Sequence, residues 1–183
     1  MTLTLDEIVI VSESSGWARV ELDGVVWEVF PTYIGCVGIG EAYEMAKSVG
    51  LELPTPALVD ATWRQADLVL PPITRRHNGT HEQMASPEVY RDHKNNVQRI
   101  FDAHPNAETF TLAAGAYKDV VMIDGKPGIY GWHVDTDAAK WKGIRLYDPE
   151  TPGRGRIIQE ATTIHSLIHG DYSQALRCCR RAR

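Results

Sequence analysis

The sequence has few cysteines, and they do not form the pattern of a disulfide-bonded or zinc-knuckle protein. Cys36 stands alone, and Cys178 and Cys179 are neighbours in a total of 3. An odd number is a poor disulfide framework, and adjacent cysteines rarely bridge because the required geometry strains the backbone. The paired spacing of a zinc knuckle is missing as well. We therefore expect reduced thiols and a cytoplasmic protein, with release by cell lysis as the route to any role outside the cell.

Long apolar runs and an excess of positive charge are also missing. No run approaches the roughly 18 residues that would span a bilayer, and residues 1–7 contain an acidic pair where a secretory signal would be basic. The formal net charge of -5 disfavours a nucleic-acid-binding protein. Residues 177–183 form a basic end, which we interpret as a solvated terminus rather than a nucleic-acid arm. We expect neither a membrane nor a nucleic-acid partner, and the sequence gives no oligomeric state.

A glycine-rich cofactor loop is the third absence. Residues 35–40, Gly-Cys-Val-Gly-Ile-Gly, precede a predicted helix. They lack the Gly-Lys-Ser/Thr ending of a phosphate loop, and they do not match the dinucleotide-binding spacing. We interpret the segment as a flexible start of a helix, and we predict no cofactor from it.

The composition is that of an ordinary globular domain. The chain has 183 residues, 43% of them hydrophobic and 23% charged, which favours one domain with a full core. Strand-like and helix-like stretches are segregated along the chain, which predicts an α+β fold. We expect one antiparallel β-sheet built from two hairpin regions, packed against about three helices. The regions are a β-hairpin region at 1–30, a helical region at 38–104, a β-rich region at 108–178 and a basic tail at 179–183.

Turn residues place the two hairpins. Asp23-Gly24 separates β-rich runs at 17–22 and 25–30, and this dipeptide is a strong hairpin signal. A second hairpin is predicted from strands at 118–123 and 128–134, joined by a turn at 124–127. Further short strands are expected at 109–112, 157–158 and 175–176.

Apolar residues at helical spacing predict three helices. The first covers 41–49 and ends at Gly50. The second begins at the N-cap Thr55 and runs to about Leu68, and the third runs from Ser86 to about His104. Between the last two lies an irregular stretch, 71–85, which is either a binding loop or a surface loop. His93 falls on the apolar face of the third helix, where a core histidine is the simpler interpretation.

Titratable side chains gather in apolar, strand-like surroundings between residues 114 and 173. His133 and His165 are candidates for a general acid or base, because the pKa of histidine lies near neutrality. Asp171 or Asp119 would orient an imidazole, and Lys118 would stabilise developing negative charge. Candidate substrate-binding residues are Trp132, Gln159, Tyr172 and Ser173. The alternative interpretation makes Lys118 and Asp119 a solvated strand start and 171–173 a turn.

A metal site is a second use of the same groups. His133 and Asp135 would share a strand face, and His165 and His169 would lie side by side on a helical turn. Three histidines and a carboxylate can bind zinc and leave a position for water. Alternatively, His169 precedes Gly170 and would only interact with a helix C-terminus.

Several of these stretches resemble an uncharacterised protein family of bacteria and their phages. The similar pieces are 53–61, 66–68, Lys-Asp-Val-Val at 118–121, Ile-Tyr-Gly-Trp-His at 129–133, Ile-Gln at 158–159, His165 and Asp-Tyr-Ser at 171–173. The chain departs from the family pattern where Ala116 and Gln174 replace histidines and His169 replaces an aromatic residue. The resemblance supports the choice of site and implies no particular reaction.

Two functions follow as hypotheses. The first is a small hydrolase with a His-centred active site, whose ligand is a small molecule or, by analogy with phage proteins, a cell-envelope polymer. The second is a non-catalytic ligand-binding or assembly module, phage-encoded in origin. The first hypothesis expects His133, His165 and Asp171 to meet in one hollow.

Overall fold

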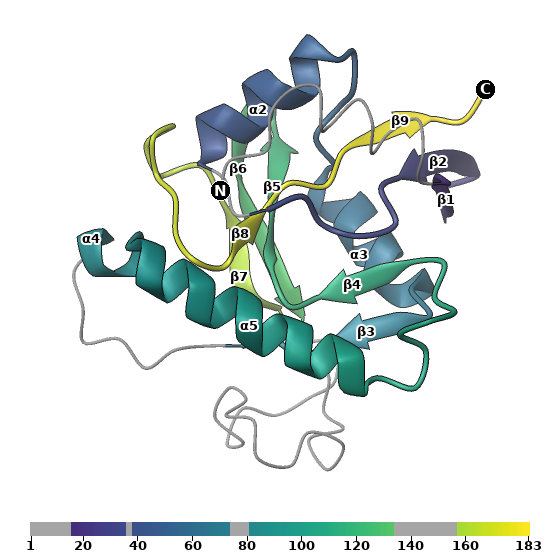
Figure 1. Ribbon diagram of the computed structural model, residues 1–183. Coiled ribbons are helices and arrows are strands. Elements are labelled where there is room, and N and C mark those ends of the chain that lie inside the picture. Colours follow the sequence, from purple (N-terminus) through teal and green to yellow (C-terminus); the bar gives the residue numbers. More distant parts are fainter. Residues whose placement is uncertain (1–15, 36–37, 74–80, 134–156) are drawn as a thin grey trace.

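A computed structural model describes residues 16–35, 38–73, 81–133 and 157–183, and it has the predicted α+β fold in a single domain (Figure 1). One antiparallel sheet has the strand order β1-β2-β9, formed by Ala18–Leu22, Val25–Val29 and Cys179–Arg181. A second sheet has the order β7-β6-β5-β8, formed by Ile157–Thr162, Lys126–His133, Lys118–Ile123 and Gln174–Ala175. Strands β3 (Leu68–Leu70) and β4 (Ala113–Gly115) make a small parallel pair. The helices are α2 (Ile39–Ser48), α3 (Pro56–Gln65), α4 (His81–Met84) and α5 (Pro87–Ala103).

Both predicted hairpins are present. Asp23 and Gly24 have φ of 52° and 75°, and Asp124 and Gly125 have φ of 48° and 77°. Positive φ at both central residues is what a two-residue hairpin turn of the favoured twist requires. The second turn is therefore shorter than predicted, and β6 begins at Lys126 instead of 128.

The helix caps are also as predicted. The Thr55 hydroxyl accepts a hydrogen bond from the Leu58 backbone N–H, and Ser86 does the same for Val89. Gly50 follows α2 with φ of 69°. These side chains and this conformation satisfy backbone groups that a helix end leaves unpaired.

Other boundaries also differ from the sequence prediction. Helix α2 covers 39–48 instead of 41–49, and β7 covers 157–162 instead of 157–158. Helix α3 ends at Gln65 instead of near Leu68, because residues 68–70 form β3 beside β4. The strand expected at 109–112 lies at 113–115 instead. The Asp67 carboxylate accepts hydrogen bonds from the backbone N–H groups of Thr111 and Leu112, which holds that segment in a loop.

Helices α2 and α3 cover opposite faces of the β5–β6 hairpin. Val120 and Ile129 are buried in one cluster with residues of α2, whereas Val121 and Tyr130 pack against Val59 of α3. Successive residues of a strand point to opposite faces. The two helices therefore pack against alternate residues of the same strands. Helix α5 packs through Ile100 against β3 and β4.

The basic end of the chain is not a solvated terminus, which corrects the sequence interpretation. Residues 179–181 form β9, which pairs with β2, and the Arg177 side chain is 1% exposed. Cys178 and Cys179 are buried as free thiols. Arg180 lies over the Trp17 ring at 4.2 Å and pairs with Glu28 at 2.7 Å. Residues 177–179 are buried, and exposure begins at Arg180 and Arg181.

Among the residues described, no helix has the length and apolarity needed to cross a bilayer.

Candidate active site

The predicted site residues are divided between the two faces of β5. Lys118 and Asp119 are adjacent in the strand, so their side chains point in opposite directions. Both are buried, with exposed fractions of 7% and 2%, so the interpretation of a solvated strand start is wrong. Each residue is the centre of a different polar cluster.

The Lys118 cluster is compact and fully paired. Lys118 Nζ lies 2.5 Å from Asp171 Oδ2, and the Ser173 hydroxyl donates to Asp171 Oδ1 at 2.6 Å. His169 Nε2 is 3.9 Å from the same carboxylate, and Lys118 lies over the Trp132 ring. Burial alone would raise the pKa of Asp171, but the Lys118 cation and the Ser173 hydrogen bonds outweigh burial and lower it. Such a satisfied buried network anchors the chain segments that carry it.

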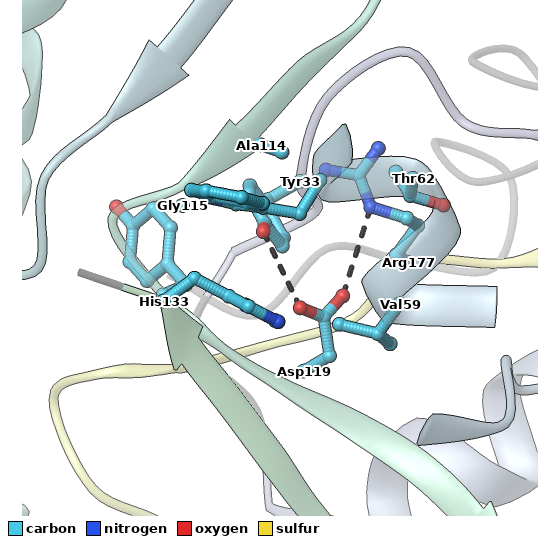
Figure 2. A pocket seen from close by; sticks show the side chains of 10 residues that line it. Tyr33, Val59, Thr62, Ala114, Gly115, Asp119, His133 and Arg177 are labelled. Carbon is cyan, nitrogen blue, oxygen red and sulfur yellow. Dashed lines mark hydrogen bonds and ion pairs between the residues drawn. The ribbon is translucent and has the colours of Figure 1, made fainter. Parts of the chain in front are cut away.

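The Asp119 cluster joins three distant segments (Figure 2). The Tyr33 hydroxyl donates to Asp119 Oδ2 at 3.3 Å, and Arg177 Nε lies 3.6 Å from Oδ1. The other guanidinium nitrogens of Arg177 donate to the backbone carbonyls of Phe30 and Ala113. Oδ1 of Asp119 accepts no hydrogen bond within the described part of the chain. Burial raises the pKa of Asp119 to about 6, although the Arg177 cation opposes the rise.

His133 lies on the same face as Asp119 and is oriented by α3. Its Nε2 is 2.8 Å from Asp60 Oδ1, and the Tyr130 hydroxyl donates to that same oxygen at 2.8 Å. The Trp63 ring stacks on the imidazole with 5.1 Å between centroids. Burial lowers the pKa of His133 despite the hydrogen bond to Asp60. Because a carboxylate only accepts, the neutral ring donates from Nε2 and keeps Nδ1 as an acceptor.

A backbone irregularity brings Tyr130 and His133 to one carboxylate. Gly131 and Trp132 have φ of 110° and 64°, and the β6–β7 register shifts at this point. In a regular strand, residues three apart would face opposite sides. The bulge removes that alternation and aims both side chains at Asp60.

Asp119 and His133 line one small cavity. Tyr33, Thr62, Trp63 and Arg177 line it as well, and its volume is about 10 Å³. That is about the space that one water molecule needs. Tyr33 and Tyr117 line both this cavity and a neighbouring groove of about 900 Å³, which extends along α5. Tyr33 and Tyr117 therefore form a wall that the cavity and the groove share.

The structure does not bring His133, His165 and Asp171 together. His133 contacts Asp60 on the α3 side, whereas Asp171 binds Lys118 on the other face of β5. His165 is half-buried and stacks on His169 with 4.1 Å between ring centroids. These two histidines lie in a turn segment and not on the predicted helical turn.

No metal site is formed by the described residues. They contain no group of three or more His, Cys, Asp or Glu side chains that could hold an ion. His165 and His169 form a pair, His133 lies elsewhere, and Asp135 is outside the described residues. Zinc binding by these four residues stays a prediction, because the described residues do not form a complete set of ligands.

The predicted substrate-binding residues have packing roles in the structure. Trp132 and Tyr172 are buried in one cluster with Val89, and Ser173 is bound to Asp171. Gln159 is half-buried on β7 and donates to the Glu160 carbonyl. None of the four is among the described residues that line the cavity or the groove.

Three residues of the site were missed by sequence reasoning: Tyr33, Asp60 and Arg177. Asp60 lies three positions before Trp63 on α3, a spacing that puts both on one helix face. Arg177 is a single cation within the apolar run Ala175–Cys179, and a lone charge in such a run is a signal of a buried ion pair. Tyr33 stands in a turn segment that carries no comparable signal.

Comparison with known proteins gives no assignment, because no family model, curated protein or solved structure matches the chain.

Proposed function

We propose that the protein is a small hydrolase whose acid/base pair is His133 and Asp119. One observation carries the proposal: a neutral imidazole held by a carboxylate and a carboxyl with a pKa of about 6 line the same water-sized cavity. The raised pKa of Asp119 lies closer to neutrality than that of an ordinary carboxyl, and the lowered pKa of His133 keeps its imidazole neutral near pH 7. One group can therefore give a proton while the other accepts one.

The roles follow from the hydrogen bonds. His133 Nδ1 accepts a proton from a water in the cavity, and Asp60 holds the ring in the tautomer that leaves Nδ1 available. Protonated Asp119 donates to the leaving group, and Arg177 and Tyr33 keep its carboxyl in place. Asp60 acts through His133 and is a positioning residue. In this proposal Lys118 and Asp171 support the strand that carries Asp119.

The substrate enters from the groove beside Tyr33. A fragment of a cell-envelope polymer is our proposed substrate, by analogy with the phage-like resemblance alone. Esters and amides of small organic acids are the simplest chemical surrogates for it.

The test is turnover of cell-wall fragments and of a panel of small esters and amides. We expect His133→Ala and Asp119→Asn to lower kcat/KM by about 100-fold or more, the usual contribution of a general acid or base. His165→Ala is the matched control, since His165 lies away from the cavity, and it should stay within about twofold. Circular dichroism would show that each variant is folded. Unchanged turnover in His133→Ala would contradict the proposal.

A non-catalytic ligand-binding module is the second candidate, and the bonding of Arg177 favours it. Its guanidinium binds two backbone carbonyls and one carboxylate, which is how a purely structural cation would be used. In that case the same panel would give ligand binding in the groove and no turnover by the wild-type protein.

A further inference from the structure

The groove beside the cavity has the size of a small-molecule site. Its volume is about 900 Å³, within the range of roughly 300–1,000 Å³ that such sites occupy. One wall is a face of α5, and the opposite wall comes from residues near Tyr33 and the start of α2. Tyr33 also lines the cavity, so a ligand in the groove would contact the tyrosine that separates it from the proposed catalytic groups.

Two cations on α5 line this groove, and neither has a partner among the residues that the structure describes. Arg91 and Lys94 are three positions apart, which puts them on the same helix face, and both line the groove and are exposed. Neither makes an ion pair or a hydrogen bond with any residue that the structure describes. Glu41 is the one acidic residue among the described lining, so two positive charges face one negative charge. The local balance is positive in a chain whose net charge is -5.

Four aromatic rings form part of the lining of the groove. Tyr33 and Tyr117 lie with 5.3 Å between centroids, and Phe101 and Phe110 with 5.4 Å. All four are half-buried and line the groove. Partly exposed rings offer faces on which a flat apolar group can pack.

We propose that the groove binds a small organic anion that carries a ring. A carboxylate or phosphate group would pair with Arg91 and Lys94, and the ring would pack on the tyrosines and phenylalanines. Arginine and lysine next to aromatic rings recognise both parts at once. That this anion is the substrate rests on the proposed hydrolase function, whereas its binding does not.

Two fluorescent probes separate the charge from the ring. 8-Anilino-1-naphthalenesulfonate is the anionic probe, and N-phenyl-1-naphthylamine has the same rings without the sulfonate. The double variant R91Q/K94Q should bind the anionic probe about tenfold more weakly and the neutral probe within about twofold. The matched control R99Q/K126Q removes two exposed cations outside the groove lining, and its affinity for both probes should stay within about twofold.

Location and head group are tested in the same assay. Ile164 and Ile168 are 86% and 92% exposed and are the rival apolar site, so I164S/I168S should leave probe binding unchanged. Benzoate or phenyl phosphate should displace the anionic probe, and the stronger of the two identifies the head group. Benzyl alcohol should not displace it.

Three results would overturn the proposal: equal loss in R99Q/K126Q, loss of binding in I164S/I168S, or unchanged anionic-probe affinity in R91Q/K94Q. His133→Ala should bind the probe as the wild type does, so a failed hydrolase proposal and a failed groove proposal give different results.

Discussion

Lys118 and Asp119 are neighbours in β5, and their opposite directions decide which residues can act together. Lys118 binds Asp171 in a fully paired cluster, whereas Asp119 faces a cavity with His133. The sequence showed that charged groups lie in an apolar setting, and both residues are indeed buried. The alternation of a strand puts the two side chains on opposite faces. The sequence did not show which partner each would contact, because those partners come from distant segments.

The buried carboxyl of Asp119 should shape how stability depends on pH. Its folded pKa of about 6 lies above the unfolded value of 3.8, so the native state binds more protons in between. By linkage, this group lowers the free energy of unfolding as the pH rises from about 4 to about 6. The total effect is up to about 3 kcal/mol.

Urea unfolding of Asp119→Asn and of the wild type at pH 4, 5, 6 and 7 measures that contribution. The stability of the wild type relative to the variant should fall across this range. His133, whose pKa is lowered by burial, contributes the opposite slope, but it is present in both proteins and cancels in the difference. A stability difference that is constant with pH would show that Asp119 titrates normally.

At the scale of elements, turns and helix caps were predicted correctly because they depend on residues close together in sequence. Asp23-Gly24, Thr55 and Ser86 each act on a backbone group within a few residues, and each lies where the sequence placed it. The parallel pair of β3 and β4 was not predicted, because its register depends on a strand far along the chain. The bulge at Gly131 and Trp132 was missed for a similar reason, since the hydrogen bonds of Asp60 lie outside β6.

Gly115 in β4 permits a contact that no other residue would allow. Its φ is 85°, and a Cβ atom there would lie 1.8 Å from the Leu70 carbonyl oxygen. We expect Gly115→Ala to lower the free energy of unfolding by at least about 3 kcal/mol, because strain and a backbone clash act together.

Gly24→Ala is the control for that variant. Gly24 has a φ of 75° and nothing within 4 Å of the added atom. Its substitution therefore adds backbone strain without a clash, at a cost of about 1–2 kcal/mol. Chemical unfolding of both variants compares the two costs. Equal losses would mean that the backbone around β3 and β4 can shift to accept a side chain.

At the scale of the whole molecule, Arg177 connects parts that are far apart in sequence. It contacts Phe30 after β2, Ala113 in β4 and Asp119 in β5. The α+β fold and the two hairpins were predictable from runs and turns, but this junction was not, because three separate segments have to be placed before one side chain can join them. The same reason explains why the candidate site moved from His165 and Asp171 to Asp60, Tyr33 and Arg177.

Removing that cation should cost far more than removing an exposed one. We expect Arg177→Met to lower the free energy of unfolding by about 3–5 kcal/mol, since Asp119 would stay buried without its partner. Arg180→Met is the matched control, because the Arg180 side chain is 47% exposed and pairs with Glu28 near the surface. Its loss should stay below about 1 kcal/mol. Thermal and urea unfolding measure both, and equal losses would contradict a central role for Arg177.

The contacts of Arg177 can form only late in the synthesis of the residues described here. A ribosome makes Tyr33, Asp60, Asp119 and His133 before it reaches Arg177, so the cavity stays incomplete until the segment around Arg177 has emerged. Products that stop before Arg177 would lack the cation that pairs with the buried Asp119 carboxyl, and they should be less stable and more readily degraded.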